Sequence, residues 1–280
     1  MFPIMDGATE PIIAVLGHPI AGNPSQFALE RAFKAMRLDW RVLSLDVHPE
    51  NIDAAITGAK VMGFRGLLLD DVNAAAAGHL RQRVTPTDTT AEAESSQQIE
   101  QSQQTEKVSE GAPPTCFFWD STDKQAYRSE NAESSWLEEL IRSHFRSPES
   151  VADGDAMGPV LWIGDTDVRF PKTMVDIDTQ SPIAWADSES IEHSKLIVLS
   201  EPVNVSKWPA NDQSTLVIDL SDSQENPDGG NHAALSKLGY TFISVEERRA
   251  AALSQCLTRW TGTRPPIDII QEAIEEYLAV

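Results

Sequence analysis

Three short runs of the sequence hold residue types that could support chemistry. Residues 63–74 begin with glycines and end in acids and alanines, residues 120–123 read Asp-Ser-Thr-Asp, and Gly164 opens an acidic turn. A carboxylate such as Asp123 can accept a proton in general acid–base catalysis. A glycine that follows a strand lets backbone N–H groups approach a phosphate. Acids and threonines before a helix are also common caps, so each run has a purely structural reading as well.

Motifs of several other chemistries are missing. The six histidines form no H-E-x-x-H or Cys/His spacing, so the sequence predicts no metal site. There is no G-x-S-x-G elbow and no G-x-x-x-x-G-K-[ST] phosphate loop. A net charge of −21 and a pI of about 4.5 argue against nucleic acid or an anionic membrane as a partner.

The compartment is predicted from the cysteines and the apolar runs. Cys116 and Cys256 are far apart in sequence, which favours reduced, buried thiols over a disulfide framework. No run resembles a secretory signal or reaches transmembrane length. We therefore expect a cytoplasmic protein.

The elements that would position these residues alternate between strands and helices. Apolar runs predict strands, and apolar residues at helical spacing predict helices from Ser25 and over 51–62. The strands are expected at 11–17, 40–47, 66–69 and 115–119, and a further helix at 136–145. This order is typical of an open parallel α/β sheet, which we assign to a first lobe of residues 1–150.

A second α/β unit is expected over residues 151–280. A boundary loop at 147–158 precedes strands expected at 160–164, 183–185, 196–200 and 216–220. Helices expected at 244–260 and 267–278 close the chain, and we expect them to return toward the first lobe. Residues 85–114 are rich in Thr, Ser, Gln and Glu, and they predict a disordered insertion because they bury too little apolar surface.

Several of these segments resemble the shikimate dehydrogenase family. Residues 63–74 resemble its pattern G-F-x-G-x-N-V-T-x-P-x-K, and Trp260-Thr261-Gly262 resembles the W-T-G element near its C-terminus. The resemblance covers nearly the whole chain. It implies a substrate-binding N-terminal domain, a Rossmann-like C-terminal domain, and NADP-dependent interconversion of 3-dehydroshikimate and shikimate.

The resemblance is poor where the family binds and activates its substrate. The lysine that handles the hydroxyl proton is replaced by Ala74, and no lysine occurs between residues 61 and 106. Asp123 matches the aspartate that partners this lysine, and Thr122 also agrees. Of the two serines that hold the substrate carboxylate, one is replaced by Asn23, and the other, Ser25, we interpret as a helix N-cap. The family's substrate-binding glutamine falls at Ala252, and Gln255 could replace it only by a register shift of nearly one turn.

The cofactor segments also depart from the family. Where the family has I-G-A-G-G, only Gly164 remains, and Asp165 and Asp167 bring negative charge toward a pyrophosphate. The N-R-T that grips the 2′-phosphate of NADP becomes residues 187–189, Asp-Ser-Glu. Asp187 suits the ribose of NAD better than the phosphate of NADP.

Two functional hypotheses follow. In the first, the chain is a catalytically degenerate shikimate dehydrogenase-like protein with no cofactor. It would act as a binding or interaction protein for a small acidic molecule, a protein partner or a second copy. In the alternative, it is a divergent but active enzyme of aromatic amino-acid biosynthesis that uses NADP or NAD.

Overall fold

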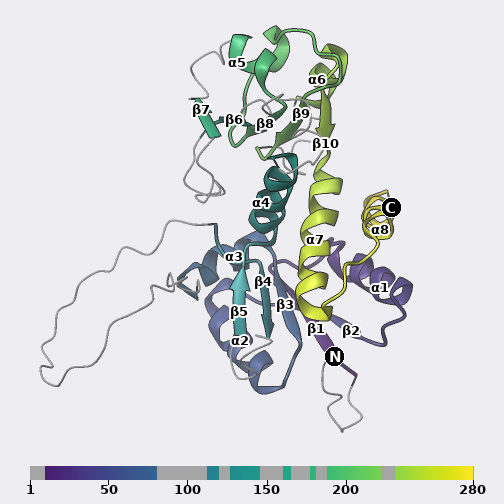
Figure 1. Ribbon diagram of the computed structural model, residues 1–280. Coiled ribbons are helices and arrows are strands. Elements are labelled where there is room, and N and C mark those ends of the chain that lie inside the picture. The colour runs from purple at the N-terminus through teal and green to yellow at the C-terminus, as the bar shows by residue number, and fades with distance from the viewer. Residues whose placement is uncertain are drawn as a thin grey trace, which may run out of the picture.

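The computed structural model describes residues 10–80, 112–119, 127–145, 160–164, 177–180, 188–221 and 231–279. These residues form two five-stranded sheets, with strand orders β2-β1-β3-β4-β5 and β10-β9-β8-β6-β7. Figure 1 shows the two sheets as separate lobes joined by long helices. The expected two-lobed α/β fold is therefore confirmed.

The first sheet is mixed rather than parallel throughout. Strands β1 (Ile12–Gly17), β2 (Arg41–Asp46) and β3 (Gly66–Leu69) run parallel, as expected. Strands β4 (Cys116–Trp119) and β5 (Tyr127–Glu130) are antiparallel to their neighbours. The prediction of a parallel sheet was therefore wrong for β4. Strand β5, which the sequence did not predict, is separated from β4 by the seven residues 120–126, and a parallel crossover needs a dozen or more.

Helices cover both faces of the first sheet. Helix α1 (Ser25–Ala35) buries Leu29 and Phe33 in one apolar cluster. On the opposite face, a 3₁₀ turn (Pro49–Asn51) leads into α2 (Ile52–Val61), which packs in a second cluster. A short helix that the sequence did not predict, α3 (Asp71–Ala76), follows β3 directly and continues into a 3₁₀ turn at Ala77–Leu80.

The second sheet is entirely parallel. Its strands are β6 (Val160–Ile163), β7 (Ile177–Gln180), β8 (Leu196–Leu199), β9 (Leu216–Asp219) and β10 (Thr241–Ile243). All residues of β6 and β8 are buried, as in a sheet covered on both faces. The short helices are α5 (Ser188–His193), the 3₁₀ turn Val205–Lys207 and α6 (His232–Leu238). The strand expected at 183–185 and the boundary loop at 147–158 lie outside the described residues.

Three further helices join or close the lobes. Helix α4 (Ala132–Phe145) begins four residues earlier than expected, because Asn131 Oδ1 accepts the N–H of Ser134 and starts the helix. Helices α7 (Val245–Thr261) and α8 (Ile267–Leu278) agree with the sequence. Side chains of α7 and α8 share one apolar cluster with α1, so the last helices do return to the first lobe.

Two segments that resemble the family form the two sides of one contact. A Cβ atom at Gly66 would lie 2.0 Å from Nε1 of Trp260, so only glycine fits there. The indole of Trp260 is held by its N–H, which donates to the carbonyl of Phe117 at 2.9 Å. Helix α7 is thereby fixed against β3 and β4.

The predicted insertion is described only at its end. Residues 85–111 lie outside the described residues, but residues 112–114 do not fit the disorder prediction. Pro114 is buried, and the carbonyl of Pro113 accepts a hydrogen bond from the side chain of Asn131 at 2.7 Å. The ordered chain therefore begins before β4, where it packs against the start of α4.

Candidate functional site

The parallel strands of the first sheet end at one edge, which is where open α/β sheets bind ligands. Strands β1, β2 and β3 end at Gly17, Asp46 and Leu69, and polar residues follow each of them. The segment after β1 and the helix α3 after β3 are those that resemble the family's substrate-binding segments. This edge is the candidate site of the first lobe.

Asp70 ties the two segments together. Its Oδ1 accepts the N–H of Asn73 at 2.8 Å and so caps α3, while its Oδ2 accepts the N–H of His18 at 2.8 Å. A Cβ atom at Gly17 would lie 2.8 Å from that Oδ2, so a larger residue at this position would displace the Asp70 carboxylate. Both carboxylate oxygens therefore serve the backbone, where the family pattern has a threonine.

Ala74 lies inside the first lobe rather than at its surface. Ala74 is 0% exposed, and it belongs to the apolar cluster that contains Leu16 and Phe117. Its N–H completes a helical turn by donating to the carbonyl of Asp70 at 2.7 Å. The position that resembles the family's lysine is therefore filled by core packing and offers no proton acceptor.

The expected role of Ser25 as an N-cap was wrong. Pro24 is the cap residue of α1, and no side chain caps that helix. The N–H of Ser25 donates instead to Oδ1 of Asn23 at 2.9 Å, and Ser25 is only 7% exposed. Asn23, at the family's first serine position, thus uses its side-chain oxygen to hold the turn that precedes α1.

A pair of histidines forms the polar surface of this edge. Nδ1 of His18 lies 2.7 Å from Oδ1 of Asp46, and the ring of His18 lies 4.7 Å from that of His48 between centroids. Nδ1 of His48 is 3.7 Å from Oε1 of Glu50.

Arg249 of helix α7 lies within electrostatic range of Asp71, the first residue of α3. Burial lowers the pKa of Arg249, and the nearby charges of Asp71 and Glu246 act in the opposite direction. Arg249 lies three residues before Ala252, the position of the family's glutamine, so it lies on a neighbouring part of the helix face. A guanidinium beside α3 suits a ligand with a carboxylate. The sequence patterns did not predict Arg249 as a site residue.

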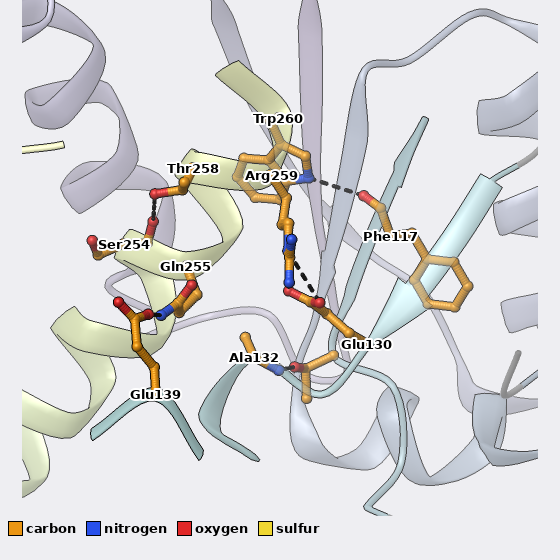
Figure 2. A network of polar contacts seen from close by, with 10 residues as sticks. Phe117, Glu130, Ala132, Glu139, Ser254, Gln255, Thr258, Arg259 and Trp260 are labelled. Carbon is orange, nitrogen blue, oxygen red and sulfur yellow. Dashed lines mark hydrogen bonds and ion pairs between the residues drawn. The ribbon is translucent and has the colours of Figure 1, made fainter. Parts of the chain in front are cut away.

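Gln255 does not replace the missing glutamine at this edge. Its Nε2 donates to Oε2 of Glu139 on α4, and Arg259 binds Glu130 at 2.9 Å (Figure 2). Both side chains line an open groove of about 460 Å³ between α4 and α7, together with Ser135, Glu138, Glu139, Arg142 and Ser143. The charged side chains of the groove already have partners, since Arg142 pairs with Glu138, Arg259 with Glu130, and Glu139 with Gln255. The groove is therefore a polar contact between the two helices.

In the second lobe, Gly164 follows β6 and has a φ of +115°. A Cβ atom there would lie 2.4 Å from Oγ of Ser200 and 3.0 Å from the backbone N of Glu201. The glycine is therefore required by the loop after β8, which packs against it. The turn that follows the glycine, residues 165–170, lies outside the described residues.

Some of the predicted site residues lie outside the described residues, namely Thr122, Asp123, Asp165, Asp167 and Asp187. The described side chains of His, Cys, Asp and Glu contain no group of three or more that could hold a metal ion. Among the described helices, none is both long and apolar enough to cross a membrane.

Comparison with known proteins adds a local sequence match. No family model matches the chain. A curated shikimate dehydrogenase (NADP⁺) from Rubrobacter xylanophilus is 34% identical over 64 residues, which are 23% of this chain and 22% of that relative. The match therefore spans about a fifth of the relative's length.

The whole chain has similar solved structures. A ligand-free 5-ketofructose reductase of Gluconobacter has a TM-score of 0.62 at 11% identity, covering 96% of this chain and 99% of that one. The shikimate dehydrogenase of Thermus thermophilus with NADP(H) and shikimate has a TM-score of 0.58 at 14% identity, covering 95% and 99%. The comparisons therefore show a local sequence similarity to shikimate dehydrogenases and a fold shared over nearly the whole chain.

Proposed function

We propose that this chain is a catalytically degenerate relative of shikimate dehydrogenase that binds a small acidic molecule and does not transfer hydride. The observation that carries the proposal is the burial of Ala74. The position that resembles the family's lysine is 0% exposed and is packed among apolar side chains. A basic side chain at position 74 therefore could not reach the carboxyl edge of the sheet without opening the core.

The missing base matters because an alcohol gives up hydride only as its hydroxyl loses a proton. General-base assistance to such a step is typically worth about a hundred- to ten-thousand-fold. The other acid of this segment, Asp70, already binds two backbone N–H groups. Asp123 resembles the family's aspartate, but in the family it works together with the lysine that this chain lacks.

We also propose that the second lobe does not bind NADP with the affinity of a working dehydrogenase. The space beside Gly164 is filled by Ser200 and Glu201. The turn that follows has aspartates where the family has small residues, and residues 187–189 lack the arginine that grips the 2′-phosphate. Like charge at this turn would repel a phosphorylated ligand.

The ligand class follows from Arg249. Its guanidinium is partly desolvated and lies within electrostatic range of Asp71 at the start of α3. We propose that it attracts a small carboxylic acid, because charge-assisted hydrogen bonds are strong where water is scarce. The chain's overall charge of −21 would disfavour an acid elsewhere on the surface.

The alternative is a divergent but active NAD(P)-dependent shikimate dehydrogenase. The 34% identity over 64 residues with a curated shikimate dehydrogenase favours it, as does the likeness to a structure solved with NADP(H) and shikimate. In that case Asp123 would act as the base without a lysine, and Asp187 would contact the ribose of NAD.

Two measurements on the purified chain separate the proposals. The first follows the absorbance of reduced nicotinamide with shikimate and either NADP or NAD, and we expect no turnover above background. Turnover that disappears in Asp123→Asn would establish the alternative. The second is calorimetry with shikimate and with NADPH, for the natural chain and for Arg249→Gln. We expect the acid to bind and the variant to lose this binding, whereas micromolar binding of NADPH would refute the cofactor proposal.

A further inference from the structure

The outer edge of the first sheet is formed by a long strand. Strand β2 is the first strand of the order β2-β1-β3-β4-β5 and has six residues, whereas the other edge strands have three or four. An unprotected edge strand presents backbone N–H and C=O groups that can pair with another strand. Figure 1 shows β2 at the rim of the first lobe, next to α1.

The backbone of β2 has one paired side and one open side. The N–H groups of Arg41 and Val47 donate to carbonyls of β1 and its preceding residue at 2.9 Å each. Because successive residues of a strand point their backbone groups to opposite sides, Val42, Ser44 and Asp46 turn theirs away from β1. Among the described strands, β1 is the one that pairs with β2, so no described strand lies on this other side.

One face of the same strand is apolar and uncovered. Val42 is buried beneath α1, on the face that α1 covers. Leu43 and Leu45, on the other face, are each 39% exposed. Edge strands are usually protected by charge, proline or a bulge. In β2 the charges stand only at the two ends, Arg41 and Asp46, so the central part of the edge is unprotected.

The open edge is complementary to itself. In an antiparallel pair centred on Ser44, the outward backbone groups of Ser44 would meet those of the second Ser44, and Val42 would meet Asp46. Leu43 of each copy would then lie opposite Leu45 of the other, in the non-hydrogen-bonded positions where side chains approach most closely. A pair centred on Leu43 would place Leu45 opposite Arg41, and a pair centred on Leu45 would place Leu43 opposite Val47. In either case fewer leucines would meet.

We propose that a second copy of this chain docks on the open edge of β2, which joins the two first-lobe sheets into one ten-stranded sheet. The two-fold axis passes between the Ser44 residues, and four leucines form the apolar centre of the contact. Two six-residue edges make an interface at or below the roughly 1,200 Å² of small specific complexes. An interface of this size is typical of weak, reversible complexes.

The charge of the chain gives the dimer a specific salt dependence. Two copies that each carry −21 repel one another, and this repulsion is screened by salt. The apolar and backbone contacts at β2 are not weakened by screening. The dimer fraction should therefore increase with ionic strength, whereas an association held by ion pairs would decrease.

The first test is sedimentation velocity over a range of protein and salt concentrations. We expect the natural chain to dimerise reversibly, and we expect Leu43→Lys and Leu45→Lys to remain monomeric with unchanged far-UV circular dichroism. The control is Val61→Lys on α2, a more exposed apolar residue at 83%, which should dimerise like the natural chain. Monomers at every concentration of the natural chain, or dimers unaffected by both β2 variants, would overturn the proposal.

The second test determines the register. Leu43→Cys and Leu45→Cys are prepared separately, then mixed and oxidised with diamide, which takes up two electrons and two protons from each thiol pair. The natural cysteines, Cys116 and Cys256, are both fully buried and leave a clean background. We expect the mixture to give a disulfide-linked dimer in higher yield than either variant alone. Preferential self-linking of one variant, or no linking above that of Val61→Cys, would refute the register centred on Ser44.

Discussion

Replacing Gly66 by alanine should strongly destabilise the protein, because the new methyl group would meet the indole of Trp260. The ideal Cβ position lies 2.0 Å from Nε1 and 2.4 Å from Cδ1 of that ring, well inside van der Waals contact. Trp260 cannot simply shift, since it is only 5% exposed and donates to the carbonyl of Phe117. The ring must move, and the hydrogen bond must lengthen or break.

The expected cost follows from these two effects. Overpacking of a core costs about 1–3 kcal/mol. A buried indole N–H that loses its acceptor costs a further ~1–3 kcal/mol. We therefore expect Gly66→Ala to lower the free energy of unfolding by about 2–6 kcal/mol, measured by urea denaturation with tryptophan fluorescence.

Two variants show whether the contact is the cause. Gly58→Ala lies in helix α2, where an added Cβ meets nothing within 4 Å, so it should raise stability by up to about 1 kcal/mol. Trp260→Leu leaves space for the methyl group, so Gly66→Ala should cost much less in that background. If the two costs simply add, or if Gly66→Ala is as mild as Gly58→Ala, the contact between Gly66 and Trp260 does not hold the lobe together.

Four further predictions follow from the site and the core. Ala74→Lys should lower stability by about 3 kcal/mol or more, because it buries an unpaired ammonium, and it should not produce shikimate oxidation in the nicotinamide absorbance assay. Burial raises the pKa of Tyr240 from 10.0 to about 12. The folded state therefore keeps this proton longer than the unfolded state does. The contribution of Tyr240 to the free energy of unfolding is therefore complete below pH 10 and is lost as the pH rises toward 12. In urea titrations across this range, Tyr240→Phe should lose less stability with rising pH than the natural chain does. Burial, together with the neighbouring Cys256, raises the pKa of the Cys116 thiol well above its usual value, so an aromatic disulfide reagent should react with both cysteines only after denaturation. Deletion of residues 86–112 should leave the thermal midpoint nearly unchanged, as their polar composition implies, and a large decrease would show that they pack against the lobe.

The sequence predicted the elements that carry continuous apolar runs. Strand β3 and helix α8 begin and end where their patterns predict. Strands β5 and β7, which read Tyr-Arg-Ser-Glu and Ile-Asp-Thr-Gln, were missed because they lie at sheet edges and carry mostly polar side chains. Such strands are defined by their hydrogen-bonding neighbours, and a single sequence does not show those neighbours.

The site was only partly accessible to sequence reasoning. The alignment located Ala74, but only the fold shows that this position lies in the core. The contact of His18 with Asp46 depends on the parallel register that pairs Gly17 with Asp46, which brings residues 28 positions apart together. Arg249 could have been noticed as a cation one turn before the glutamine position, but its approach to α3 depends on how α7 crosses the lobe.

The residues that match the family and those that do not have different physical roles. Gly17, Gly66 and Gly164 each sit where a Cβ atom would collide with a neighbouring segment, and Trp260 fills the space beside Gly66. These matches are needed by any chain that folds in this way, whether or not it catalyses a reaction. The family-matching residues in the described part of the chain therefore account for the fold without reference to substrate. Evidence of activity must come from ligand binding and turnover, because a shared fold does not itself supply a reaction.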